Sequence, residues 1–184
     1  MTPLLLSPKK TASWICGLMR ENSESVGFIP EPTIQGQYLG KNRVIFQMDS
    51  RGRQVGYLLH GAIYPARPVH ITQTAIIHEK RLLSFGTQAI AELARRAITV
   101  NASSIRLRCA EDLEALFFWQ KNGFQIERID APNNRRNRRI YVMSRPLALP
   151  LFDHAEQEKP SCRILTLQHD AIAEGEQAGE TATR

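Results

Sequence analysis

The apolar residues near the start of the chain recur at helical spacing. They predict a helix over residues 9–24, which Gly27 ends. Residues 28–42 carry two prolines and two glycines, which predicts loops with at most one short turn of helix, and their apolar residues suggest a lid. The apolar stripe of the first helix is made by Ala12, Ile15, Cys16 and Met19.

Strict alternation of apolar and polar residues follows in two short runs. Residues 44–48 and 55–59 alternate on either side of the turn 50–53, which predicts an antiparallel hairpin. Residues 70–78 are rich in β-branched side chains and predict a third strand. A helix is expected next, with an apolar stripe made by Ile90, Leu93, Ala94, Ala97 and Ile98.

The rest of the patterned region predicts a strand over residues 105–109, a helix over 111–122, and a terminal strand pair over 124–130 and 140–145. This order of elements implies an α/β fold of the α+β kind. We expect a mixed central sheet of about six to seven strands, with helices on both of its faces.

Charge divides the chain in two. Residues 148–184 hold seven acids against three bases, so the net charge of +6 is the sum of +10 for residues 1–147 and −4 for the tail. We therefore expect one domain over 1–147 and an acidic C-terminal extension over 148–184, whose end is predicted to be disordered. A strongly positive body attracts phosphates and nucleic acid, although solubilising surface charge explains it equally well.

The remaining composition argues against several classes of protein. Three cysteines without CxxC spacing predict neither a disulfide framework nor a zinc knuckle, and they fit a cytoplasmic location. The apolar run at residues 4–6 is too short for a membrane span. The five histidines show no paired-ligand spacing, so we predict no metal site.

Residues 81–86, RLLSFG, lie where a predicted strand leads into a predicted helix. The unpaired N–H groups and the positive dipole end of such a helix form an anion site. The segment resembles the pyrophosphate loop of the GNAT (GCN5-related N-acetyltransferase) superfamily, whose pattern is Arg or Gln, two residues, Gly, one residue, and then Gly or Ala. Arg81 and Gly86 match this pattern, and Ser84 replaces the first glycine.

A second segment, residues 110–124, resembles the later helix of the same family, with its alanine, aromatic pair, lysine and closing Gly-Phe. Asp112 stands where the family has an asparagine, and Trp119 stands where it commonly has a tyrosine that protonates the coenzyme A thiolate. An indole N–H does not supply that proton. The resemblance covers about residues 26–147, and it includes sequence features of several phage and mobile-element members of the family.

The resemblance implies an acetyl-coenzyme A-dependent N-acetyltransferase that transfers the acetyl group directly to an amine. It places the coenzyme against the third strand, the loop and the later helix. A backbone N–H of the strand would then donate a hydrogen bond to the oxyanion of the tetrahedral intermediate. The implied coenzyme-binding residues are Thr74, Ile76, Ile77, Arg81, Leu83, Ser84, Phe85, Gly86, Thr87 and Trp119.

An amine acceptor must lose a proton before it attacks the thioester, so a base is required. In the family this base lies eleven residues before the loop arginine, a position held here by His70, whose ordinary pKa suits the role. His60 and Glu79 are weaker candidates. Tyr141, and less so Tyr57 and Tyr64, are candidates for the missing acid, although each of these residues is also an ordinary strand or loop residue.

Four arginines cluster between the last two predicted strands, where they could bind phosphates or an acidic peptide. They are Arg135, Arg136, Arg138 and Arg139. The acceptor therefore stays open between a protein or small-molecule amine and, as in Mom-like GNAT proteins, a DNA base; a degenerate domain that binds coenzyme A without catalysis is a third alternative. Binding of nucleic acid and formation of a homodimer stay open, and binding to a membrane is not expected.

Overall fold

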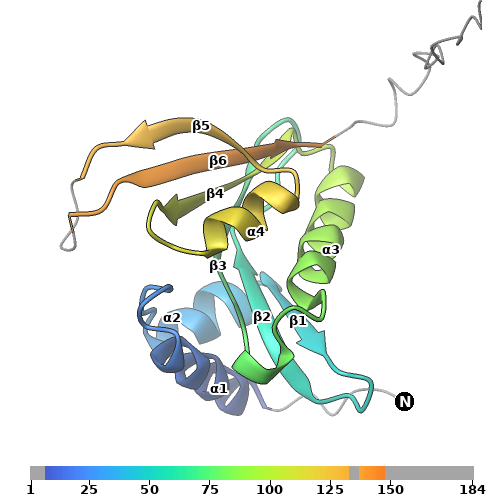
Figure 1. The fold of residues 1–184 in the computed structure, drawn as a ribbon. Helices are drawn as coiled ribbons and strands as arrows, with labels where there is room; N and C mark the ends of the chain where they lie inside the picture. Colours follow the sequence, from blue (N-terminus) through green and yellow to red (C-terminus); the bar gives the residue numbers. More distant parts are fainter. Residues whose placement is uncertain (1–6, 133–136, 148–184) are drawn as a thin grey trace, which may run out of the picture. The chain divides into compact units, whose positions relative to one another are not determined.

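The computed structural model describes residues 7–132 and 137–147. Within them the strands form one six-stranded sheet in the order β1-β2-β3-β4-β6-β5 (Figure 1). Neighbouring strands are antiparallel except β3 and β4, which are parallel, so the sheet is mixed as expected. The strands are β1 (Val44–Met48), β2 (Gln54–His60), β3 (Val69–Ile76), β4 (Ser104–Ala110), β5 (Gln125–Asp130) and β6 (Ile140–Pro146).

Helices cover both faces of the sheet (Figure 1). The helical elements are α1 (Pro8–Glu21), α2 (Glu31–Thr33), the π-helix η1 (Ile34–Leu39), the 3-10 turn η2 (His78–Lys80), α3 (Phe85–Thr99) and α4 (Ala115–Lys121). The predicted stripes of α1 and α3 are the buried ones, because helical spacing places their apolar residues on one side.

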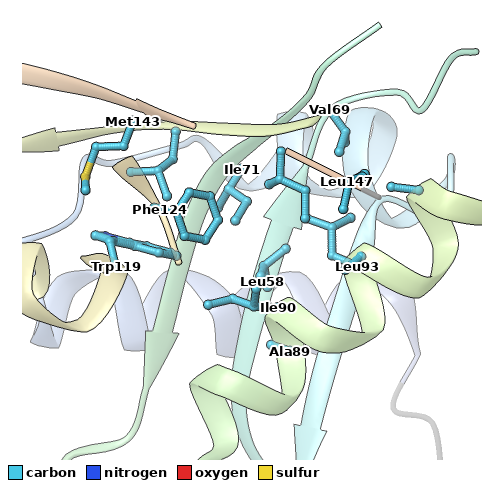
Figure 2. Packing of buried hydrophobic residues seen from close by; sticks show 14 of the residues in the cluster. Leu58, Val69, Ile71, Ala89, Ile90, Leu93, Trp119, Phe124, Met143 and Leu147 are labelled. Atoms are coloured by element: carbon cyan, nitrogen blue, oxygen red, sulfur yellow. The ribbon is translucent and has the colours of Figure 1, made fainter. Parts of the chain in front are cut away.

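The two faces have separate apolar cores. On one face α3 and α4 pack against all the strands except β5, with Leu93, Trp119 and Phe124 among the buried side chains (Figure 2). On the other face α1 and η1 pack against β1, β2 and β3, around Ile15, Ile34 and Tyr57.

β3 and β4 separate soon after they meet. Their parallel pairing is limited to Val69 with Ile105 and His70 with Arg106, although β3 continues to Ile76 and β4 to Ala110. Figure 1 shows the two halves of the sheet diverging from this point. The facing edges of both strands therefore have no strand partner over most of their length.

A bulge in β3 changes which face its side chains meet. Leu59 pairs with Gln73 and His60 with Ile71, so Thr72 is an extra residue. Ile71 belongs to the α3 side of the sheet, whereas Ala75, four residues later, belongs to the α1 side. The bulge thus turns Thr74 and Ile76 toward the side of α3 and α4.

The structure corrects two of the sequence predictions. Residues 31–39 are helical rather than loop, since Pro32 lies in the first turn, where its missing N–H costs nothing, and Ile34 is fully buried. The later helix begins at Ala115 rather than at 111, because Glu111 continues the strand pairing by donating its N–H to the Arg139 carbonyl.

Candidate functional site

The N-terminus of α3 lies at the end of the loop that follows β3. The first bond of the helix runs from the Gln88 N–H to the Ser84 carbonyl, at 2.9 Å. The N–H groups of Phe85, Gly86 and Thr87 therefore have no partner within the helix. Together with the helix dipole these groups are suited to a diphosphate, and the binding of one there stays a prediction.

Ser84 adopts the left-handed conformation, with φ of 63°. This is the conformation that glycine adopts without steric cost, which gives a physical reason for the glycine of the family pattern. The serine side chain is exposed and makes no capping hydrogen bond. Leu82 has φ of 61° and is also fully exposed, so the loop holds two strained residues.

We expect Ser84→Gly to raise the free energy of unfolding by about 0.5–1 kcal/mol, because it removes left-handed strain and costs only part of that gain in chain entropy. Urea denaturation measures this change. Ser84→Ala, which keeps the Cβ, is the matched control and should give no gain. A loss of stability in the glycine variant would contradict the assigned loop conformation.

The free edge of β3 offers backbone groups toward β4. Ile77 donates its N–H to the Val55 carbonyl at 2.9 Å, so its amide is used by β2. Since donors alternate along a strand, the amides of Thr74 and Ile76 point to the opposite edge, where β4 has separated. Of the amides of residues 74–77 that were predicted as oxyanion donors, those of Thr74 and Ile76 therefore stay candidates. The prediction is wrong for Ile77, because its amide already binds the Val55 carbonyl.

Arg81 does not point its guanidinium into the helix N-terminus. Its Nε donates to the Ile76 carbonyl at 3.4 Å, and its Nη2 donates to the side-chain oxygen of Asn22, the residue that caps the C-terminus of α1. Arg81 thereby connects the loop to α1 on the other side of the strand. An open groove of about 270 Å³ lies at this junction, lined by Glu21, Asn22, Glu24, Ser25, His78 and Arg81.

Gly86 lies directly against α4. A Cβ at this position would be 2.8 Å from Cζ of Phe118, which is closer than side chains approach one another. A side chain at this position would therefore push against the ring of Phe118, so the absence of a Cβ lets α3 and α4 pack closely here. Phe118 is half-buried against the core.

Trp119 is buried, with 6% of its surface exposed. Its ring makes edge-on contacts with Phe118 and Phe124, at centroid distances of 5.0 and 5.4 Å. Figure 2 shows Trp119 beside Phe124. These contacts give it a packing role in the α4 face of the core, and its contact with a coenzyme stays a prediction.

His70 lies in the short part of β3 that pairs with β4. Its neighbours Val69 and Ile71 are buried on the α3 face, so the exposed His70 side chain lies on the opposite face. Tyr141 lies on the α4 face, half-buried, opposite Cys109 and Ile129 in the sheet. The two predicted catalytic residues therefore occupy opposite faces of the sheet.

The weaker candidates separate clearly by burial. Tyr57 is fully buried, its hydroxyl donates to Gln73 at 2.8 Å, and burial raises its pKa well above the ordinary value, so it is no proton donor to a substrate. Glu79 and Tyr64 are exposed. His60 is buried, with Nδ1 2.7 Å from the Gly61 carbonyl and Nε2 without a hydrogen-bond partner.

His60 predicts a loss of stability in mild acid. Burial first, and then the charges of Arg96 and Arg43, hold its pKa below the ordinary value. In mild acid His60 is therefore protonated in the unfolded chain but stays neutral in the folded chain. Above about pH 6.5 this residue does not change the free energy of unfolding. Below that pH the free energy of unfolding falls, by up to about 1.4 kcal/mol per pH unit. Urea denaturation as a function of pH measures this slope. His60→Gln should flatten it, whereas His78→Gln, at an exposed position, should not.

Two of the four clustered arginines are held in ion pairs within the chain. Nε of Arg138 lies 3.0 Å from Asp112, and its Nη1 donates to the Glu24 carbonyl at 3.3 Å. Nε of Arg139 lies 2.8 Å from Glu111. Arg138 and Arg139 are thus not a free phosphate-binding pair, and Arg135 and Arg136 lie outside the described residues. A role of this cluster in binding substrate stays a prediction.

Sequence reasoning missed the connections across the site. Nothing in the sequence marks Asn22 as the partner of Arg81, or Glu24 and Asp112 as partners of Arg138, because each pair joins segments far apart in the chain. The bulge at Thr72 also has no sequence signature here, since no glycine marks it.

Known structures of N-acetyltransferases share this fold. Ard1 from Thermoplasma volcanium superimposes with a TM-score of 0.67 at 19% identity, covering 78% of this chain and 95% of that one. The ribosomal-protein-S18-alanine N-acetyltransferase from Escherichia coli gives 0.60 at 12% identity, with coverage of 79% and 92%. An aminoglycoside 6'-N-acetyltransferase complexed with coenzyme A gives 0.62 at 12% identity, with coverage of 74% and 91%.

These similarities define the class of fold: the chain has the GNAT acyltransferase fold, with its mixed sheet covered by helices on both faces. No protein-family model matches the sequence, and no curated protein matches it. At identities of 12–19% these solved structures show the fold, and the activity and the substrate are matters for proposal.

None of the helices in residues 7–132 and 137–147 is long and apolar enough to cross a membrane. Over the same ranges no group of three or more histidine, cysteine or acidic side chains could hold a metal ion.

Proposed function

We propose that the protein is an N-acetyltransferase that moves the acetyl group of acetyl-coenzyme A directly to an amine. One observation carries the proposal: β3 stops pairing with β4 after His70, the amides of Thr74 and Ile76 point to the unpaired edge of β3, and the loop after β3 leads to the N-terminus of α3. Solved structures with this fold include acetyltransferases, one of them complexed with coenzyme A.

The residues present fit the coenzyme. The N–H groups of Phe85, Gly86 and Thr87 would hold the diphosphate, with Leu83 and Ser84 in the loop that leads to them. The free edge of β3 would pair with the amide-containing arm, and an amide of Thr74 or Ile76 would donate to the thioester carbonyl. When bound, the coenzyme supplies an activated acetyl group.

The transfer then needs one proton removed and one supplied. The amine nitrogen attacks the carbonyl carbon, the carbon–sulfur bond breaks, and the thiolate leaves. In our proposal His70 accepts the proton of the amine. Tyr141 is the proposed donor to the thiolate, since it lies on the α4 face, where the family's tyrosine is replaced by Trp119.

Binding and turnover are tested separately. Acetyl-coenzyme A should raise the melting temperature, because a ligand at one hundred times its dissociation constant stabilises the folded state by about 2.7 kcal/mol. Release of free thiol in the presence of amines and peptides should then report transfer. If the melting temperature does not change with the concentration of acetyl-coenzyme A, the proposal is wrong. Binding without any release of thiol would favour the non-catalytic alternative. Mass spectrometry of host DNA tests the alternative of a DNA-base acceptor.

His70→Ala should lower kcat by at least about tenfold and leave coenzyme affinity unchanged, because a positioned base contributes about 10²–10⁴ in rate. The acidic limb of the pH–rate profile should move as well. His78→Ala, at an exposed position beyond the strand, is the matched control. Full activity and an unaltered profile in His70→Ala would show that His70 is only a strand residue.

A further inference from the structure

β5 is an edge strand at the end of the sheet. It pairs with β6 alone, and none of its six residues is buried. An unpaired strand edge of this kind presents backbone donors and acceptors to any strand that fits it.

Two exposed isoleucines lie on this strand. Ile126 and Ile129 are 41% and 52% exposed. They pair with Met143 and Tyr141 of β6, and the bulge at Glu127 brings both isoleucines to the same face of the sheet. Proteins usually keep such apolar side chains away from an open edge, so their presence indicates an interaction surface.

The sequence of β5, QIERID, is complementary to itself in antiparallel orientation. About a twofold axis between Glu127 and Arg128, Ile126 stands opposite Ile129 of a second copy. In the same register Glu127 stands opposite Arg128, and Gln125 opposite Asp130. Every contact occurs twice, as an isologous interface requires.

The charged side chains already lie on the face that such pairing needs. Glu127 forms an ion pair with Arg106 of β4 at 3.1 Å, and Arg128 forms one with Asp130 at 2.7 Å. Arg106 and Arg108 point away from the core, since their neighbours Ile105, Leu107 and Cys109 are buried in it. Glu127 and Arg128 therefore share the outer face, and the isoleucines share the other.

We propose that β5 pairs with β5 of a second copy of this chain, in the antiparallel register that places Glu127 opposite Arg128. The proposal is independent of the acetyltransferase function. One six-residue strand buries less surface than a standard interface, so the dimer is weak and its population depends on concentration.

Charge reversal tests the register in the full chain. Glu127→Arg alone, or Arg128→Glu alone, places like charges opposite each other twice and should weaken dimerisation about tenfold in sedimentation velocity. An equimolar mixture of the two variants should restore a heterodimer, and the doubly reversed chain should restore a homodimer. If the single variants dimerise like the parent, or the mixture stays monomeric, the proposal is overturned.

The apolar contact has its own test. Ile126→Lys should weaken the dimer, whereas Tyr64→Lys, which changes a similarly exposed residue outside β5, should not. Equal effects of the two changes overturn the proposal. A parent chain that is monomeric at all concentrations also overturns it.

Discussion

Gly86→Val should weaken acetyl-coenzyme A binding by at least about tenfold, which corresponds to about 1.4 kcal/mol. The added side chain would meet the ring of Phe118, with a Cβ distance of 2.8 Å to Cζ and 3.1 Å to Cε2. If α3 moves away from α4, the amides that start α3 are displaced, and if the ring moves instead, the valine side chain remains beside those amides. Isothermal titration with acetyl-coenzyme A measures the loss.

A double-variant cycle distinguishes two reasons for the same loss. If the ring is the obstacle, Phe118→Leu should restore part of the binding lost in Gly86→Val, with Phe118→Leu alone as the control. If the valine instead blocks the path of the diphosphate, shortening Phe118 restores nothing. Unchanged binding in Gly86→Val would mean that the coenzyme loop is misassigned.

Trp119→Ala should lower the free energy of unfolding by about 3–5 kcal/mol, which is the usual cost of removing a large aromatic side chain from a core. Trp119 lies between Phe118 and Phe124, so its loss leaves a cavity between α4 and the sheet. Urea denaturation measures the change. Phe117→Ala on the same helix, at a residue that is 75% exposed, is the control and should have little effect.

The conservative variant Trp119→Phe separates packing from coenzyme contact. If Trp119 only packs, this variant loses some stability and keeps its affinity for acetyl-coenzyme A. A loss of affinity at nearly native stability would instead support the predicted contact between Trp119 and the coenzyme. A loss of less than about 1 kcal/mol in Trp119→Ala would contradict the core position.

The sequence was sufficient for the order and type of most elements, because periodicity depends on local geometry. The stripes of α1 and α3 and the alternation of β4 each place apolar residues on one side, and the structure buries those sides. The sequence did not indicate that β2 is buried on both of its sides, or that in β1 Gln47 is buried while Phe46 and Met48 are half-buried. It was misleading over residues 31–39, where Ile34 and the packing against α1 outweigh the prolines and glycines. Tertiary contacts overrode local propensity there.

The candidate site was predictable only in part. The loop before α3 was found from the junction of strand and helix and from Arg81 and Gly86, but the contacts that these two residues make within the chain were not expected. Arg81 holds α1 through Asn22, and Gly86 makes room for Phe118. Both partners are distant in sequence, so no local pattern could reveal them.

The sequence by itself determined most of the helices and strands, their order, and the place of the helix end at α3 for which we propose an anion site, since each follows from local periodicity or from the unpaired amides of a helix end. The tertiary structure alone decided where β3 and β4 separate, which amides face the gap, and that His70 and Tyr141 lie on opposite faces. The bulge at Thr72 and the pairing of β3 with β4 set these positions. Strand pairing joins residues far apart in the chain, and a one-residue shift in it reverses the face of every side chain that follows.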